Sequence, residues 1–315
     1  MIAETDNRLA AEDEALLRDL LRHVFGSRVE LAAYRIGNRR YDYAVLLATL
    51  HHPQLEVVIK LAGPEAPFVY PFDRTAMLHR LVAANTSITM PKILAVDVSY
   101  AAWPWRYLIK THIVGDEWAT IRHTLSADEL QSAYTQLGNA FAQLHCIPFS
   151  AFGELIVDGM VQVAASPLAA LETRARQAIQ APELRELFLG ILADRAELFA
   201  DVATPCLCHD DLHHHNILFR PHQGRWQLAT ILDFDKAWAG HGESDLARLE
   251  LWQGMTRPGF WPAYQAVRAV PPSYADRRPI YQLLWCLEYA VPSPQHHADT
   301  QNVCAQLGIA PVRFG

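Results

Sequence analysis

The sequence predicts an α+β fold with two lobes, a small β-rich N-terminal lobe over residues 1–113 and a mainly helical C-terminal lobe over residues 114–315. Two observations favour it. Segments with strand-like patterns lie mostly before residue 113, whereas the apolar spacing of helices prevails after about residue 126. The chain has 315 residues, of which 51% are hydrophobic, and this length suits two modest lobes better than one.

The N-terminal lobe is predicted to contain helices at two places and five strands. Apolar residues from Leu16 to Phe25 recur at the spacing of one helix face, and Gly26 stands where a helix typically ends. Turn-forming residues at Gly37-Asn38 and His51-His52-Pro53 separate the first strands. The predicted elements are a helix over residues 13–25, strands at Val29–Tyr34, Tyr41–Leu50, Leu55–Leu61, Met90–Val96 and Tyr107–Ile113, and a helix from about Asp73 to Asn85.

The C-terminal lobe reads mainly as helix. Ser126 and Glu129 have the spacing of a capping box, and the helix that they open carries apolar residues on one face as far as Leu144. Residues 166–200 are helical in composition, and so is most of the chain after Asp245.

A polar loop in the C-terminal lobe carries the residue types of phosphoryl transfer. It follows the short apolar strand Cys206–Cys208 and contains His209, Asp211 and Asn216 at the spacing H-x-D-x4-N. Moving a phosphoryl group to an alcohol needs an acceptor for the hydroxyl proton and metal ions that screen the phosphate charge. Asp211 is the candidate base.

A hairpin after this loop is predicted to bring a third polar residue back to it. Strands at Ile217–Phe219 and Trp226–Leu232 flank a turn at Arg220–Arg225, and Asp233 ends the second strand. Asn216 and Asp233 therefore stand at the same end of the hairpin. Their oxygens are the hard ligands that Mg²⁺ prefers, with water or phosphate at its other positions.

These motifs resemble those of the aminoglycoside phosphotransferase and choline kinase-like family, which are small-molecule kinases with a protein-kinase-like fold. That family carries H-G-D-L-x-x-x-N, an I-D-W/F-acid strand end and a downstream D-L-A. The matching stretches here are residues 209–216, 231–235 and 245–247, with Asp210 in place of the usual glycine. The resemblance implies a bilobal protein-kinase-like fold that transfers the γ-phosphate of ATP to a hydroxyl of a small molecule.

The resemblance also implies a role for each polar residue of the loop. Asp211 is expected to orient and deprotonate the acceptor hydroxyl, while His209 braces the loop against Asp245. Asn216 and Asp233 are expected to hold Mg²⁺.

Lys60 is the candidate phosphate-binding lysine of the N-terminal lobe. It stands near the end of the third predicted strand, like the family's lysine that contacts the α- and β-phosphates of ATP. Taken alone, it reads as a solvated lysine at a strand edge. The family pairs this lysine with a helical glutamate, but the corresponding position here is Thr75, which cannot form an ion pair. Asp73 either substitutes for that glutamate or caps the helix.

Four more residues of this lobe are implied to bind the nucleotide. Gly37 and Asn38 fall in the loop over residues 36–40 that would cover the phosphates, although an ordinary hairpin turn explains them equally well. Thr111 and Ile113 fall at the hinge whose backbone is expected to hydrogen-bond adenine.

Two other functions are considered. Thr75 and the sparse glycines of the phosphate loop favour a nucleotide-binding, pseudokinase-like module with weak catalysis, although Asp211 preserves the base. His213-His214-His215, next to His209-Asp210, suggests a metal-dependent phosphohydrolase. Adjacent side chains point in different directions, however, and cannot all face one ion.

Charge and composition restrict the partners. The net charge of −7 argues against nucleic acid and favours a cationic small-molecule acceptor. An aminoglycoside, a macrolide, choline or another amino alcohol, and a sugar-like metabolite are all compatible with the motifs. The acids that can meet amines, each of which also reads as a structural carboxylate, are Glu243, Glu250, Asp276 and Glu288.

The expected location is the cytoplasm, without a membrane partner. The five cysteines are odd in number and irregularly spaced, which is typical of free thiols in a reducing compartment. Residues 1–6 lack the basic and apolar regions of a signal peptide. No apolar run reaches the roughly 18 residues of a membrane span.

Overall fold

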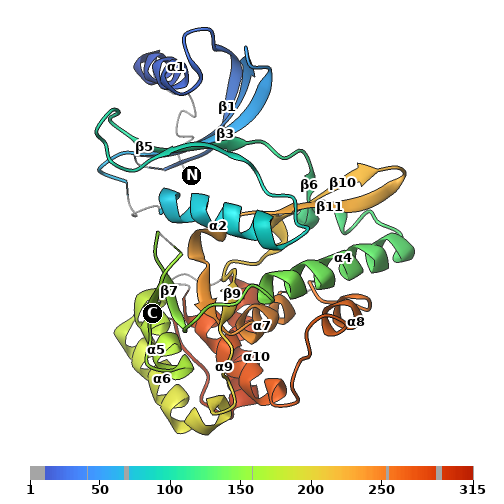
Figure 1. The fold of residues 1–315 in the computed structure, drawn as a ribbon. Coiled ribbons are helices and arrows are strands. Elements are labelled where there is room, and N and C mark those ends of the chain that lie inside the picture. Colours follow the sequence, from blue (N-terminus) through green and yellow to red (C-terminus); the bar gives the residue numbers. More distant parts are fainter. Residues whose placement is uncertain are drawn as a thin grey trace. The chain divides into compact units, whose positions relative to one another are not determined.

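A computed structural model describes residues 11–40, 42–66, 71–157, 159–252, 255–288 and 293–314. The chain forms two compact units. The first comprises Met1–Ala84 with Thr89–Val114, and the second comprises Asn85–Ile88 with Gly115–Gly315. The predicted α+β class is confirmed, with the sheet-rich unit first and the helical unit second (Figure 1). Two sequence predictions, on residues 1–6 and on Tyr41, lie outside the described residues.

The first unit is built on a five-stranded antiparallel sheet in the order β1-β2-β3-β5-β4. All five predicted strands and both helices are present, with ends shifted by a few residues. The longest extension is in β1, which continues past Tyr34 to Arg40. The elements are α1 (Ala11–Phe25), β1 (Glu30–Arg40), β2 (Tyr43–His51), β3 (Leu55–Ala62), α2 (Phe72–Asn85), β4 (Ile93–Asp97) and β5 (Arg106–Thr111).

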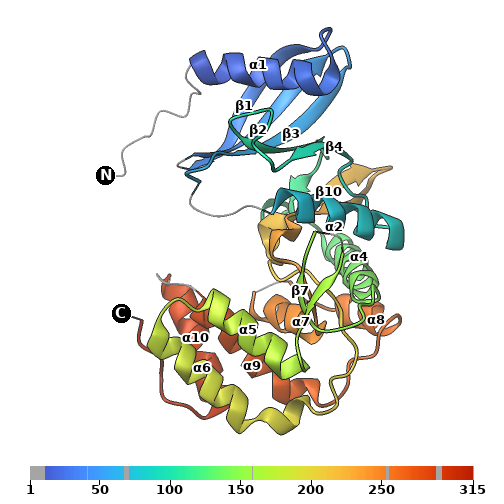
Figure 2. The ribbon, with the colours of Figure 1, turned by 60° about the vertical axis from the view of Figure 1, so that its left-hand side comes forward.

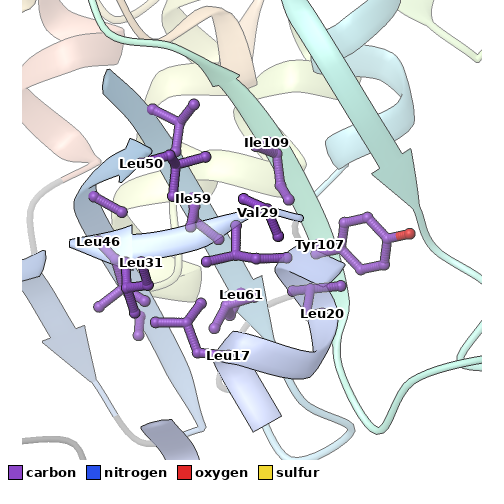
Figure 3. Packing of buried hydrophobic residues seen from close by; sticks show 14 residues of the cluster. Leu17, Leu20, Val29, Leu31, Leu46, Leu50, Ile59, Leu61, Tyr107 and Ile109 are labelled. Atoms are coloured by element: carbon purple, nitrogen blue, oxygen red, sulfur yellow. The ribbon is translucent and has the colours of Figure 1, made fainter. Parts of the chain in front are cut away.

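Alternation along the strands gives this sheet two buried faces. Ala44, Leu46 and Ala48 of β2 belong to the cluster that contains Leu17 and Leu20 of α1, and Figure 3 shows these helix leucines among the strand side chains. Figure 2 shows α1 lying over β1, β2 and β3. Residues of the opposite parity, including Tyr43, pack instead with α2. Because successive side chains of a strand point to opposite faces, parity separates the two faces along the regular strands β2, β3 and β5.

The second unit combines helices with two small sheets, β11-β10-β6 and β8-β7-β12-β9. In Figure 2, α5 lies beside α6 and α9 beside α10. Its helices and strands are β6 (Asp116–Glu117), α3 (Trp118–Ile121), α4 (Ala127–His145), β7 (Gly153–Leu155), β8 (Val161–Val163), α5 (Pro167–Ala178), α6 (Pro182–Asp194), β9 (Cys206–Cys208), β10 (Ile217–His222), β11 (Arg225–Ile231), β12 (Trp238–Gly240), α7 (Glu243–Leu251), α8 (Phe260–Gln265), α9 (Tyr274–Leu287) and α10 (Pro294–Leu307). Short 3₁₀ turns are η1 (Ala196–Phe199), η2 (His214–Asn216) and η3 (Phe234–Lys236).

Helix α4 is the element on which the hairpin of the second unit rests. The predicted capping box is present, because the Ser126 side chain accepts from the Glu129 amide and the Glu129 side chain accepts from the Ser126 amide. On the same helix, Gln136 accepts from the Leu228 amide and donates to the Trp226 carbonyl oxygen, which ties α4 to β11 (Figure 1). The hairpin that ends at the polar loop is therefore fixed on a capped helix.

Among the described residues, no helix is both long enough and apolar enough to span a membrane. The cysteines are free, and all of them are buried except Cys146.

Gly138 allows α4 and α8 to approach closely, and its replacement tests this packing. A Cβ at position 138 would overlap the Phe260 carbonyl oxygen. We expect Gly138→Ala to lower the free energy of unfolding by about 1–3 kcal/mol, the usual range for overpacking, despite the better helix propensity of alanine. The matched control is Gly190→Ala in α6, where no atom lies near the added Cβ. That change should stabilise the protein by about 0.5–1 kcal/mol. Equal effects of the two substitutions in denaturant unfolding would contradict the packing at Gly138.

Candidate active site

The polar loop follows β9 and leads into the β10–β11 hairpin. The antiparallel register pairs Ile217 with Ile231. The Leu232 amide then donates to the Asn216 carbonyl oxygen at 2.7 Å. Asn216 and Asp233 therefore stand at the same end of the hairpin, as the sequence predicts. The turn is tighter than predicted, because the strands extend to His222 and from Arg225 and leave only two residues between them.

The carboxylate of Asp245, at the start of α7, fixes the beginning of the loop. One oxygen accepts from the His209 amide at 2.7 Å, and the other accepts from the Asp210 amide at 2.9 Å. The ring of His145 lies 3.1 Å from the same carboxylate through Nε2, and its Nδ1 lies 2.8 Å from the Tyr264 hydroxyl. Asp245 is fully buried. Its hydrogen bonds replace those that the buried carboxylate would otherwise form with water.

His209 braces the loop from inside. Its Nε2 donates to the Leu232 carbonyl oxygen at 2.7 Å, and its Nδ1 accepts from the Asp211 amide at 3.2 Å. These roles require the neutral imidazole. Burial agrees with this state, because it lowers the pKa of His209 despite the nearby carboxylates. The ring of His209 therefore links the loop to the residue before Asp233. Its contact with Asp245 is made through the backbone rather than through the ring.

Asp210, where the resembling family has glycine, is held by an ion pair. Its φ of 62° lies in the left-handed region, which glycine adopts freely and aspartate adopts more readily than most residues. The buried Asp210 carboxylate pairs with Arg174 of α5. Arg174 also pairs with Glu154 at 2.7 Å, donates to the Lys236 carbonyl oxygen at 2.7 Å and stacks on the Trp238 ring. Arg174 thus fastens the loop to the segment that follows Asp233.

Asp211 is an ionised carboxylate held between two cations. Its Oδ1 accepts from Arg248 at 3.0 Å and lies 3.5 Å from the Lys236 ammonium. Burial alone would raise the pKa of Asp211, but attraction to Arg248, Lys236 and nearby histidines outweighs it, and the net effect is a lowered pKa. Arg248 also donates to the carbonyl oxygens of Leu212 and Asp210. The Arg248 guanidinium therefore lowers the pKa of Asp211 and also holds the loop around it.

Asn216 and Asp233 offer the donor set of a magnesium site. The side-chain nitrogen of Asn216 donates to the Asp211 backbone carbonyl oxygen at 2.8 Å. The side-chain oxygen of Asn216 is therefore the atom that can bind a cation. Asp233 has a left-handed backbone with φ of 65°. Such conformations in non-glycine residues carry strain and concentrate at functional sites. Two hard oxygen donors at one hairpin end fit Mg²⁺, which takes few protein ligands.

The three adjacent histidines have different partners. His213 Nδ1 accepts from the His215 amide, His214 Nε2 lies 2.7 Å from Arg122, and His215 Nδ1 lies 2.6 Å from Glu117. Within the described part of the chain, no group of three or more His, Cys, Asp and Glu side chains is arranged to hold a metal ion.

In the first unit, Lys60 lies in β3, the central strand of the sheet, and is only 8% exposed. It faces away from α1, since its neighbours Ile59 and Leu61 belong to the α1 cluster. Its cross-strand partners are Val45 and Leu108. The alternative of a solvated lysine at a strand edge is therefore wrong.

The predicted phosphate-covering loop over residues 36–40 is strand. Gly37 and Asn38 lie within β1, and the register with β2 shifts between Ile36 and Asn38. A bulge absorbs one residue there, so the chain continues as β-structure where glycine and asparagine suggested a loop or turn. The chain reverses only near Asp42, whose φ is 51°.

The remaining candidates of the first unit are at the end of β5 and on α2. Thr111 is the last residue of β5, and its amide and side chain bond to Lys92. Ile113 follows it and is partly buried. Thr75 is buried on α2, and its hydroxyl donates to the Pro71 carbonyl oxygen at 2.9 Å.

Three residues that contact the polar loop were not predicted from the sequence, namely Arg174, Arg248 and Lys236. Arg248 had a detectable signal, because it follows Asp245 by three residues and so shares its helix face. Lys236 follows Asp233 by three residues. Arg174 had no detectable signal in the sequence, because its pairing with Asp210 depends on how α5 packs.

A search of protein-family models finds the phosphotransferase enzyme family over residues 50–280. This match spans more than two thirds of the chain. The chain belongs to this phosphotransferase family. Membership supports a small-molecule phosphotransferase, as the motifs and their geometry indicate.

Solved structures with the same fold are small-molecule kinases. A protein described as a fructosamine-3-kinase from Haemophilus somnus 129PT is 17% identical, with a TM-score of 0.67 over 93% of this chain and 97% of that one. Aminoglycoside phosphotransferase APH(4)-Ia, in complex with AMP-PNP and hygromycin B, is 15% identical, with a TM-score of 0.64 over 92% and 96%. ADP-bound APH(2'')-Ib is 17% identical, with a TM-score of 0.60 over 96% and 100%. At these identities the likeness establishes the bilobal, protein-kinase-like fold.

The ion pair between Arg174 and Asp210 predicts a specific pattern of stabilities. Arg174→Ala leaves a buried carboxylate without its cation, which typically costs about 3–5 kcal/mol. Adding Asp210→Gly removes that carboxylate and suits the left-handed backbone, so the double variant should recover at least half of the loss. Denaturant unfolding of both single variants and the double variant completes the cycle. A double variant as unstable as Arg174→Ala would show that Arg174 acts through its other contacts.

Proposed function

We propose that the protein transfers the γ-phosphate of ATP to a hydroxyl of a small molecule. The observation that carries the proposal is the arrangement of Asp211, Asn216 and Asp233 around one end of the β10–β11 hairpin. Family membership supports phosphoryl transfer, and the nucleotide and the acceptor class are our proposals.

Asp211 is proposed as the base. The acceptor oxygen forms a bond to the γ-phosphorus while the bond from that phosphorus to the bridging oxygen of ADP breaks, and the hydroxyl proton passes to Asp211. The lowered pKa keeps Asp211 ionised and so able to accept a hydrogen bond from the hydroxyl. A base of low pKa mainly orients the hydroxyl and takes its proton late, which suits a loose transition state.

Asn216 and Asp233 are proposed to hold Mg²⁺. When bound, the metal would screen the charge of the phosphate oxygens. The side-chain nitrogen of Asn216 donates to the Asp211 backbone, so that its side-chain oxygen is available to the metal. Relatives bound to AMP-PNP, ADP or GDP support a nucleotide as phosphate donor.

In the first unit, Lys60 is proposed to contact the nucleotide phosphates. Its side chain leaves the central strand on the face away from α1, between two apolar neighbours, where an ammonium is desolvated and so attracts phosphate strongly. Gly37 and Asn38 are proposed to contribute backbone from the bulged end of β1. Thr111 and Ile113 are proposed to lie at the adenine-binding hinge.

One observation favours a second candidate, a nucleotide-binding module with weak catalysis. Thr75 occupies the expected glutamate position, and its hydroxyl bonds to the Pro71 carbonyl oxygen. Nucleotide binding without turnover on any acceptor would support this candidate.

Asp211→Asn tests the proposed base. This substitution preserves shape but removes the proton acceptor, so we expect turnover to fall about 10²-fold or more, while nucleotide affinity stays near normal. Release of ADP is followed with whichever small hydroxyl compound the native protein phosphorylates in a screen. Unchanged turnover would remove Asp211 from the mechanism.

Arg248 should set the pH at which activity is lost in acid. Activity requires ionised Asp211 and falls as the pH drops through its pKa, which Arg248 lowers. Replacement of Arg248 by methionine should raise that pKa and move the acid limb of the kcat/KM profile to higher pH. Arg248→Lys keeps the charge and should leave the limb near its native position. An acid limb that is the same in the native protein and the methionine variant would contradict this electrostatic role.

A further inference from the structure

A cavity of about 440 Å³ lies beside the catalytic loop, within the second unit. Small-molecule sites commonly enclose about 300–1,000 Å³. Arg248 lines this cavity, and its guanidinium is 3.0 Å from Asp211 Oδ1. His214, three residues after Asp211, lines it as well. The cavity is therefore positioned to present a bound hydroxyl to the proposed base.

The aromatic surface of the cavity favours a ring. Trp285 is almost fully buried and is covered by the Arg248 guanidinium, whose Cζ lies 3.5 Å from the ring centroid. Trp252 is only partly buried and meets the His214 ring edge-on, at 6.2 Å between centroids. Trp252 thus offers an indole surface against which a sugar or aromatic ring can pack.

The charge of the cavity disfavours a polycation. Its described lining contains Arg122 and Arg248, whereas Asp299 is the one carboxylate among these lining residues. A ligand with several ammonium groups would meet the Arg122 guanidinium here, together with the Arg248 guanidinium that Asp211 partly balances, and would find one carboxylate in the described lining to pair with.

Three of the four acids that the sequence offered to amines have partners outside the described lining of the cavity. Glu243 pairs with Arg277, and Glu250 bonds to Tyr274. Glu288 lies 3.9 Å from the Lys236 ammonium. None of these three carboxylates lines the cavity.

We propose that this cavity binds the phosphate acceptor, and that the acceptor is a ring-bearing hydroxyl compound that is neutral or anionic rather than a polycationic aminoglycoside. The ring would pack on Trp252, with its polar edge toward Arg122, Gln295 and Asp299. Repulsion by the guanidinium groups excludes polycations, which is how charge commonly sets specificity. The inference rests on the proposed function, and it points away from the cationic acceptor that the net charge of −7 favours.

Ligands of different charge test the proposal, and two of them, the glucuronide and the glucoside, differ chiefly in charge. The probes are 4-nitrophenyl β-D-glucuronide, the neutral 4-nitrophenyl β-D-glucoside and the polycation kanamycin, each titrated into the full-length protein by calorimetry. Both glycosides should bind more tightly than kanamycin, and the glucuronide most tightly. Tighter binding of kanamycin than of both glycosides, or no glycoside binding at millimolar concentration, would overturn the proposal.

Substitutions at two lining positions, Arg122 and Trp252, each with a control variant, locate the effect in the cavity. Arg122→Glu should weaken glucuronide binding about tenfold or more, because a charge-assisted hydrogen bond is lost, and should strengthen kanamycin binding. Arg225→Glu makes the same charge change at an exposed position outside the described lining and should alter neither affinity markedly. Trp252→Ala should weaken both glycosides severalfold, whereas Trp252→Phe should retain most of the affinity. Equal responses to Arg122→Glu and Arg225→Glu would overturn the assignment.

Release of ADP with MgATP separates this proposal from the proposed function. Phosphorylation of kanamycin in preference to the glycosides would support the kinase function and overturn the acceptor class. Binding of the glycosides in the expected order without phosphorylation of any probe would support the cavity as a site for such ring compounds and would count against the proposed phosphoryl transfer, in favour of the weakly catalytic module.

Discussion

The site depends on the hydrogen bonds between the buried carboxylate of Asp245 and the polar loop. This carboxylate accepts hydrogen bonds from the backbone amides of His209 and Asp210 and contacts the ring of His145. An unpaired carboxylate at this depth would be protonated or would destabilise the fold, so the loop must present its amides to α7. Once these amides are fixed, the left-handed backbone of Asp210 directs the chain toward Asp211. The aspartate of the D-L-A motif therefore anchors the polar loop that carries the candidate base.

Arg248 connects Asp211, the candidate base, to the cavity proposed for the acceptor. Burial alone would raise the pKa of this carboxylate, and Arg248 and Lys236 lower it. The same Arg248 stacks on Trp285 and forms part of the cavity wall. The Arg248 guanidinium therefore contacts both the candidate base and the cavity wall. In our proposal, the residue that lowers the pKa of Asp211 also disfavours polycationic acceptors.

Local signals allowed much of the site to be predicted from the sequence, and non-local packing set the limit. The hairpin register follows from alternation and a turn, so the meeting of Asn216 and Asp233 was predictable. The aspartate at position 210 was visible as a departure, but its partner Arg174 was not, because no periodicity connects a helix face to a distant loop. Gly37 misled in the other direction, since a bulge keeps the chain in β1 where glycine suggested a loop. The fold class and the predicted elements of the first unit followed from residue patterns, which parity and capping made reliable.

The most direct test of the account is the thermal stability of the protein with and without MgATP, because it requires no knowledge of the acceptor. A ligand that binds the native state stabilises it, by about 2.7 kcal/mol at one hundred times its Kd. The account predicts a rise in Tm with ATP that requires Mg²⁺, is lost in Asp233→Ala and survives in the control Asp276→Ala on α9. No shift at millimolar nucleotide, or an equal shift without magnesium and in Asp233→Ala, would contradict it.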